Sequence, residues 1–197
     1  MMKRVFDIVF AVAMLVLFTP LFVVLAIWIS ADSKGGVFFG QVRVGINGKH
    51  FKLWKFRTMK PQSEKGGQLT VGASDSRITR AGYFLRKFKV DELPQLWNVL
   101  MGDMSVVGPR PEVPRYVAMY SPEQQLVLSI RPGITDYASL LYFEESDLLA
   151  KAEHPEQTYI REIMPAKLAL NIEYVHKHSF TGDLAIIVQT GLRILKA

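Results

Sequence analysis

The sequence has no cysteine among its 197 residues, which excludes disulfide bonds and thiolate metal sites. A bound metal would therefore need hard oxygen ligands or histidine. The four histidines, at positions 50, 154, 176 and 178, do not have metal-ligand spacing with other donors, so we interpret them as surface or hydrogen-bonded side chains. If a metal is used, this composition favours an ion held by carboxylate oxygens.

Charged residues are absent from the 22 positions between Ile8 and Ile29. As one helix this segment would be about 33 Å long, close to the thickness of a bilayer core. It is longer than the apolar part of a cleaved signal peptide, which has about 7 to 15 residues. Pro20 removes the hydrogen bond to the Val16 carbonyl, so we predict a bend there, and Thr19 can offer its hydroxyl to a freed carbonyl.

Acidic residues are absent from positions 33 to 60, which contain seven lysines and arginines. Lys3 and Arg4 precede the apolar segment, so both of its flanks are basic. A straight span would put one basic flank on the wrong side of the membrane, whereas a helix-break-helix hairpin that enters and leaves by one face satisfies both. From these residues alone, a single span kinked by proline stays an equal alternative.

Residues 35 to 59 alternate between apolar and polar side chains in the manner of strands. Asn47-Gly48 in their middle predicts a β-hairpin with a type I′ turn. Lys55 and Arg57 are two residues apart and therefore lie on one strand face, where they could hold a diphosphate. The alternative is a solvated basic strand beside anionic lipid headgroups. Residues 77 to 88 then have the spacing of a cationic amphipathic helix at a membrane interface.

An acid pair, Asp91 and Glu92, follows that helix and precedes a second segment of helical periodicity. Because Pro94 is tolerated only in a first turn, we predict Asp91 as the N-cap and Glu92 as the first helical residue. The helix dipole would then favour an ionised aspartate, suited to bind a divalent metal or to attack phosphorus. Acids at helix starts are most often simple caps. The predicted buried face of the helix consists of Leu93, Leu96, Trp97 and Leu100.

A rigid turn, Gly108-Pro109-Arg110-Pro111, follows this helix. Two prolines fix the backbone on either side of Arg110, so its guanidinium is restricted and suited to grip a phosphate with two donors. The alternative is a structural turn with a solvated arginine.

These motifs together resemble a known family. The sequence resembles the monotopic phosphoglycosyl transferases, bacterial membrane-bound sugar transferases that move a sugar-1-phosphate from a UDP-sugar to polyprenyl phosphate. The resemblance covers nearly the whole length, and the matching segments are Thr19-Pro20 in the apolar segment, residues 55–59 (KFRTM), 91–98 (DELPQLWN), 102–111 (GDMSVVGPRP) and 131–135 (RPGIT).

The resemblance implies an α/β mixed, mainly helical fold. Residues 1–33 would form a re-entrant membrane hairpin broken at Thr19 and Pro20, and residues 34–197 a small catalytic domain with interfacial helices and a short β-hairpin. It also implies a place at the bacterial inner membrane, with the catalytic domain on the cytoplasmic face.

The resemblance further implies that Asp91 is the nucleophile, which attacks the β-phosphate of the UDP-sugar, expels UMP and forms a covalent phosphosugar. Glu92 would serve as a metal ligand or as a base toward polyprenyl (undecaprenyl) phosphate, and Mg²⁺ bound by Asp91 and Glu92 would offset the diphosphate charge. An enzyme of the same pathway with a direct ternary mechanism is an alternative. The implied phosphate-binding residues are Lys55, Arg86 and Arg110, and Arg57 and Arg131 from their neighbourhood.

The sequence departs from the family pattern at two places. Asp136-Tyr137-Ala138-Ser139 stands where the family usually has Gly-Trp-Ala-Gln, and Asn171 stands where an acid is common before a Tyr-Val pair, here Tyr174-Val175. If the first segment lines the sugar pocket, its departure bears on the identity of the sugar and leaves phosphate transfer unaffected.

The net charge of +6 and a pI near 9.5 indicate an acidic partner, which admits a second class of function. A membrane-anchored basic module that binds anionic lipid or nucleic acid would explain the charge and the apolar segment. It would not explain an acid pair followed by a clamped arginine. Aromatic residues interleaved with basic ones are sparse outside residues 51–56, so we expect no nucleic acid partner.

Overall fold

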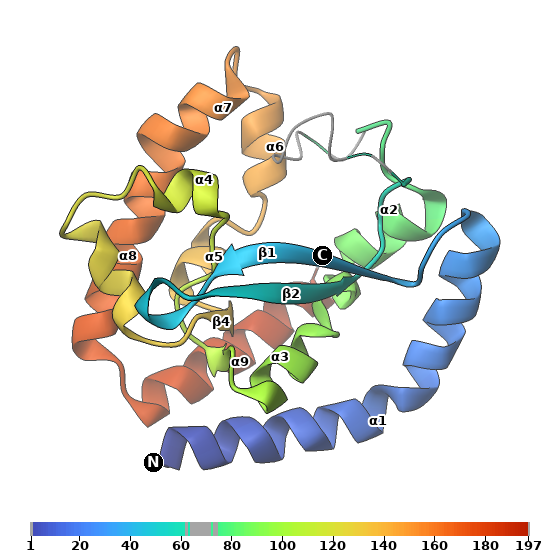
Figure 1. Ribbon diagram of the computed structural model, residues 1–197, viewed down its shortest axis with the longest axis horizontal. Coiled ribbons are helices and arrows are strands. Elements are labelled where there is room, and N and C mark those ends of the chain that lie inside the picture. Colours follow the sequence, from blue (N-terminus) through green and yellow to red (C-terminus); the bar gives the residue numbers. More distant parts are fainter. Residues whose placement is uncertain (1, 62, 64–71, 73–74, 197) are drawn as a thin grey trace.

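The computed structural model describes residues 2–61, 63, 72 and 75–196. In this part of the chain the structure is mainly helical, with one antiparallel and one parallel pair of strands (Figure 1). The predicted mainly helical fold with a short β-hairpin is therefore confirmed. The re-entrant path through a membrane stays a prediction.

The first helix, α1 (Met2–Asp32), contains Pro20 and bends near its middle, so that its two arms run in different directions (Figure 1). The hydroxyl of Thr19 donates to the Leu15 carbonyl at 2.7 Å, and not to the Val16 carbonyl that Pro20 leaves without its usual donor. Within the described residues, α1 is the one helix whose length and composition would allow it to cross a membrane. Its exposed apolar side chains include Val5, Val9, Val12, Val16, Leu17, Val23, Val24 and Ile27.

Both arms of α1 belong to the core of the protein. Ala11 on the first arm packs in a cluster with Val99 and Met104. Leu25 and Ile29 on the second arm pack in another cluster around Phe56 and Leu85, and a third cluster lies among the C-terminal helices. The predicted division into residues 1–33 and 34–197 stays a prediction, but α1 shares its cores with the rest of the chain.

Strands β1 (Phe38–Val44) and β2 (His50–Phe56) form the predicted antiparallel hairpin, with Phe38 opposite Phe56 and Val44 opposite His50. They are joined through a short 3₁₀ turn, η1 (Ile46–Gly48). Asn47 and Gly48 have φ angles of 55° and 73°, the left-handed pair that a type I′ turn requires, and Lys49 N donates to the Ile46 carbonyl at 3.2 Å. The prediction from the Asn-Gly dipeptide is confirmed.

Helix α2 (Arg80–Lys87), the 3₁₀ turn η3 (Val90–Glu92) and helix α3 (Gln95–Met101) carry the chain through the acid pair. The prediction that Asp91 caps a helix is wrong. Lys89, at φ 55°, turns the chain into η3, and α3 begins only after Pro94, with no side-chain cap. The predicted buried face of α3 is also corrected, because Trp97 is 51% exposed whereas Asn98 is 1% exposed.

Strands β3 (Ser105–Val107) and β4 (Gly133–Thr135) pair in parallel next to α3. The two chains approach so closely that a Cβ on Gly133 would lie 2.1 Å from the nitrogen of Gly108, and one on Gly108 would lie 2.5 Å from the carbonyl oxygen of Arg131. Only glycine fits at these two positions, so the segment that leads to Arg110 is held tightly against β4.

Short helices and two longer ones complete the fold. The C-terminal helix α9 (Phe180–Leu195) leaves Leu184, Val188, Leu192 and Leu195 exposed, an apolar surface of the kind that helices at a membrane interface have. The elements are α4 (Pro114–Val117), η4 (Gln124–Ser129), α5 (Tyr137–Leu141), α6 (Glu145–Ala150), α7 (Pro155–Thr158), the π-helical η5 (Tyr159–Ile163), α8 (Met164–Lys177) and α9 (Phe180–Leu195).

Candidate active site

Glu92 lies between two cations that come from distant parts of the chain. The Nζ of Lys55, on β2, lies 2.8 Å from Glu92 Oε1. Arg110 donates from Nη1 to Oε2 at 3.0 Å and from Nη2 to Oε1, which is a two-pronged ion pair. Burial alone would raise the pKa of Glu92, but Arg110 and Lys55 together hold it well below its usual value. Glu92 is therefore a fixed negative charge.

Asp91 is in a different electrostatic state from its neighbour. It is 7% exposed, and among the residues that the structure describes its carboxylate has no hydrogen-bond donor. Burial raises the pKa of Asp91; the charge of Lys55 opposes this rise, and the carboxylate of Glu92 adds to it. The expectation that a helix dipole favours the ionised form is thus overturned together with the helix cap. A carboxylate with free oxygens beside lysine and arginine side chains remains available to react.

Asn98 of α3 places Lys55. Its Oδ1 accepts a hydrogen bond from Trp54 N at 3.0 Å, and its Nδ2 donates to the Lys52 carbonyl at 2.8 Å. The side chain thereby replaces a neighbouring strand along the free edge of β2. Since α3 directly follows the acid pair, this buried amide ties β2 to the helix next to Glu92.

Asp136 places Arg110. This aspartate is fully buried, and its Oδ2 accepts a hydrogen bond from Arg110 N at 2.9 Å. Its Oδ1 accepts from Ser139 N at 2.5 Å, so the same side chain caps α5. The Gly133 nitrogen donates to the Pro109 carbonyl at 3.0 Å. The first departure from the family pattern thus contains a residue that holds the turn at Arg110 in place.

Arg86 lies in the last turn of α2, and its charge is one of those that oppose the raised pKa of Asp91. Lys89 adds a similar influence, while burial lowers the pKa of Lys89 itself. The structure therefore brings Lys55, Arg86 and Arg110 around the acid pair.

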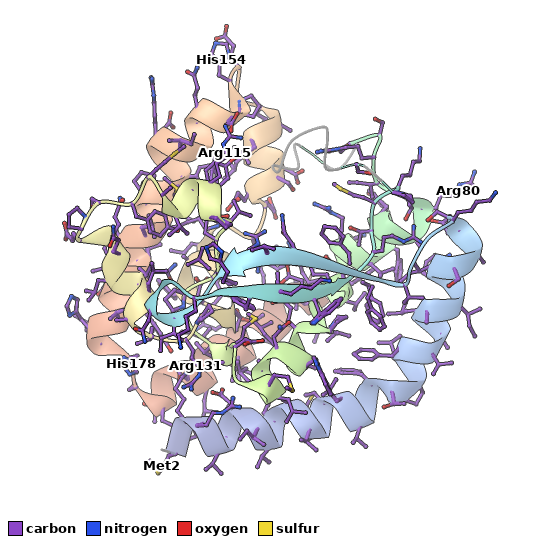
Figure 2. All side chains as sticks on the ribbon, viewed as in Figure 1. Met2, Arg80, Arg115, Arg131, His154 and His178 are labelled. Atoms are coloured by element: carbon purple, nitrogen blue, oxygen red, sulfur yellow. The ribbon has the colours of Figure 1, made fainter. Side chains whose placement is uncertain are left out.

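Arg57 and Arg131 lie elsewhere. Arg57 donates to the carbonyls of Ser33 at 2.9 Å and Gly36 at 2.5 Å, and so binds the segment that directly follows α1. Arg131 is exposed and donates from Nε to the Gly102 carbonyl at 2.9 Å. It lies toward the end of the molecule where Met2 begins α1, whereas Arg80 of α2 lies on the opposite side (Figure 2). A phosphate-binding role for Arg57 and Arg131 stays a prediction.

The acid pair could bind a magnesium ion if substrate phosphates and water supplied most of the other ligands. Among the described residues, no group of three or more acidic or histidine side chains could hold a metal. Asp91 offers free carboxylate oxygens, whereas both oxygens of Glu92 are engaged by Lys55 and Arg110. Mg²⁺ is commonly bound by one or two carboxylates together with substrate phosphates and water, and this donor set matches that arrangement. Bound Mg²⁺ stays a prediction.

Sequence reasoning missed Asn98 and Asp136 as positioning residues. The signal for Asn98 was a polar side chain within an apolar helical pattern, and that for Asp136 was an Asp-x-x-Ser sequence at a helix start. Asn171, the second departure, is buried in α8, and its Oδ1 has no hydrogen-bond partner within the described part of the chain. No role follows from that observation alone.

A buried aspartate with free oxygens, beside a glutamate that is clamped by lysine and arginine, fits the class of phosphoryl-group transferases. Comparison with known proteins gives the family. Residues 1–197 match the family described as bacterial sugar transferase, and the chain belongs to this family, as the resemblance predicted.

Curated relatives agree with this assignment. The chain is 36% identical over 191 residues to a UDP-glucose:undecaprenyl-phosphate glucose-1-phosphate transferase of Caulobacter vibrioides, covering 95% of this chain and 67% of the relative. It is 40% identical over 158 residues to a UDP-N-acetylgalactosamine-undecaprenyl-phosphate N-acetylgalactosaminephosphotransferase of Aeromonas hydrophila, covering 77% of this chain and 37% of the relative. The chain thus spans only part of these relatives. The predicted enzyme class, a sugar-phosphate transferase, is confirmed at the level of the family.

Proposed function

We propose that the protein transfers a sugar-1-phosphate from a UDP-sugar to polyprenyl phosphate and releases UMP. The observation that carries the proposal is the contrast within the acid pair. Asp91 is buried with free oxygens, and Glu92 is locked between Lys55 and Arg110. The names of the relatives support a UDP-sugar donor and undecaprenyl phosphate as the acceptor.

In the first step a carboxylate oxygen of Asp91 attacks the β-phosphorus of the UDP-sugar. The bond between this phosphorus and the bridging oxygen breaks, and UMP leaves with that oxygen. The sugar phosphate is then covalently attached to Asp91. The raised pKa of Asp91 reflects a poorly solvated carboxylate, and weak solvation makes an ionised carboxylate a better nucleophile.

In the second step a phosphate oxygen of the polyprenyl phosphate attacks the same phosphorus. The bond to Asp91 breaks, the carboxylate is regenerated and the sugar ends on a polyprenyl diphosphate. Lys55, Arg86 and Arg110 would stabilise the negative charge on the phosphate groups. Bound Mg²⁺ would supply further neutralisation of the diphosphate, held by Asp91 and by phosphate oxygens, with Glu92 as a ligand only if it releases one of its cations.

The contacts of α1 support a place at the membrane surface. Arg4, near its start, donates to the Val99 carbonyl, and Asp32, at its end, accepts a hydrogen bond from Ala81 N. Both ends of this apolar helix are thus tied to the same folded part, as a re-entrant hairpin requires. Exposed apolar side chains of α1 and α9 would face lipid, with the site on the cytoplasmic face of the inner membrane.

The test is a measurement of UMP release by purified protein with undecaprenyl phosphate, Mg²⁺ and a panel of donors that includes UDP-glucose and UDP-N-acetylgalactosamine. We expect UMP from at least one donor, and none from Asp91→Asn. Asp147→Asn, a change at an exposed aspartate of α6, is the matched control and should retain activity. Absence of UMP with every donor, or full activity of Asp91→Asn, would refute the proposal and favour a binding module.

The covalent step has its own test. Without an acceptor, the enzyme should release about one UMP per active site and gain the mass of a sugar phosphate, and with the acceptor it should show ping-pong kinetics. Sequential kinetics without a mass increase would indicate direct transfer between the two bound substrates.

A further inference from the structure

Two charged side chains of α1, Arg4 and Asp7, contact the folded part of the protein. They are three residues apart, so they lie on one face of the helix. Asp7 is 3% exposed, and its buried carboxylate directly precedes the uncharged run from Ile8 to Ile29 in the same helix. A buried charge is costly unless it is well hydrogen-bonded, so the contacts of Asp7 indicate what it is for.

Arg4 binds the end of α3. Its Nη1 donates to the Val99 carbonyl at 2.6 Å, and its Nη2 donates to the Leu100 carbonyl at 3.0 Å. These are carbonyls of the last helical turn, where a cation is favourable because the helix dipole is negative there. The basic flank of α1 therefore fastens α3, the helix whose other end follows Glu92.

Asp7 binds β3. One oxygen, Oδ1, accepts hydrogen bonds from both the Ser105 hydroxyl and Val106 N, each at 3.0 Å. Ser105 is itself 1% exposed, so the contact is closed to water. The same face of α1 thus holds α3 through Arg4 and β3 through Asp7.

The segment from β3 to Arg110 is stiff enough to transmit a displacement. Gly108 N donates to the Thr135 carbonyl at 3.1 Å, Pro109 has a fixed φ, and Arg110 N is held by Asp136. Glu92 lies in η3, directly before α3, and not in this segment. A shift of β3 would therefore move Arg110 relative to Glu92.

We propose that Arg4 and Asp7 form a brace in which α1 sets the position of Arg110 relative to Glu92. Both are positioning residues, and α1 is then part of the catalytic architecture in addition to its predicted role in the membrane. The inference rests on the proposed function, because its effect on activity is exerted through Arg110.

The conservative variant Asp7→Asn separates hydrogen bonding from charge. The amide oxygen of asparagine can accept both hydrogen bonds that Oδ1 accepts, so Asp7→Asn should stay within about threefold of the wild-type kcat/KM. Asp7→Ala removes both bonds, and we expect kcat/KM to fall by about tenfold to 100-fold, since small misplacements of a catalytic group cost this much. Ser105→Ala removes one bond and should be intermediate. Val9→Ala, on the exposed face, is the matched control.

A double-mutant cycle shows whether Asp7 acts through Arg110. In an Arg110→Ala background, Asp7→Ala should cause little further loss of kcat/KM. Hydrogen exchange supplies a readout that needs no activity. The Val106 and Arg110 amides should exchange faster in Asp7→Ala than in wild type, and Asp7→Asn should restore their protection.

Three results would overturn the brace: an Asp7→Asn enzyme as impaired as Asp7→Ala, fully additive losses in the cycle, or an unchanged exchange rate of the Arg110 amide in Asp7→Ala. If the wild-type protein releases no UMP, the proposed function fails. The exchange rates of the Val106 and Arg110 amides still decide whether Asp7 holds this segment in place.

Discussion

The side-chain oxygen of Asn98 accepts a hydrogen bond from the main-chain nitrogen of Trp54, the residue before Lys55. Through this contact the helix that follows the acid pair also holds the strand that carries the lysine of the site. The position of Lys55 against Glu92 therefore depends on one buried amide, which takes no part in the proposed chemistry.

Replacing Asn98 by alanine should lower both stability and activity. Trp54 N and the Lys52 carbonyl would lose their partner, so we expect the free energy of unfolding to fall by about 2 to 4 kcal/mol. Denaturant unfolding in detergent measures this loss, and kcat/KM reports the displaced Lys55. Asn98→Asp keeps the acceptor for Trp54 N but places a buried carboxylate oxygen against the Lys52 carbonyl and the Asp103 carboxylate, so at neutral pH it should be at least as destabilising as alanine. An alanine variant equal to wild type would contradict this role.

The side chain of Asp136 makes two contacts, a cap on α5 and a hydrogen bond from Arg110 N, which variants can separate. Asparagine has one acceptor oxygen, so Asp136→Asn can keep either the cap on α5 or the contact to Arg110 N, whereas Asp136→Ala loses both. We expect the alanine variant to lose about 2 to 4 kcal/mol of stability and the asparagine variant about half of that. Thermal unfolding of the two variants gives the comparison. Equal stability of Asp136→Ala and wild type would be inconsistent with this assignment.

The raised pKa of Asp91 predicts the acid limb of the pH–activity profile. Attack on phosphorus needs the ionised carboxylate, so activity should fall as the pH decreases through a pKa above the ordinary aspartate value of 3.8. Lys55 opposes protonation of Asp91, so Lys55→Met should move this limb to higher pH, whatever its effect on the maximal rate. Profiles of kcat/KM from pH 4 to 8 check both statements. A limb that moves to lower pH in Lys55→Met would contradict the assigned cause.

Glu92 should contribute to the pH dependence of stability. Its pKa is depressed in the folded state, so its contribution is present above the unfolded pKa and is lost as the pH falls through the folded value. Glu92→Gln should therefore be less stable than wild type at neutral pH, and the difference should shrink on acidification. Chemical denaturation at a series of pH values measures this difference, and a gap that is constant with pH would speak against it.

The re-entrant path of α1 can be tested with single cysteines, because the natural sequence has none. In right-side-out and inside-out vesicles, cysteines at positions 2 and 34 should react with a membrane-impermeant reagent from the same side. The physical basis is the bend at Pro20 and the attachment of both arms to the same folded part. Labelling from opposite sides would identify a spanning helix.

Local features were determined by the sequence because they depend on neighbouring residues only. Asn47-Gly48 specified the hairpin turn through its left-handed φ angles, and Pro20 specified the bend of α1 by removing a hydrogen bond. The motif around Asp91 and Glu92 identified the family before any geometry was known.

Tertiary structure decided the features that depend on residues far apart in the sequence, such as the burial of each side chain and the geometry of the site. Asp91 does not cap a helix, because the chain turns at Lys89 into a separate 3₁₀ turn and α3 begins only after Pro94. Burial within the folded protein raises the pKa of Asp91. Apolar periodicity misplaced Trp97 because it does not distinguish a side chain that faces the core from one that faces outward. Hydrogen bonds from β4 and Asp136 hold the turn that carries Arg110, and no local pattern encodes contacts over such separations.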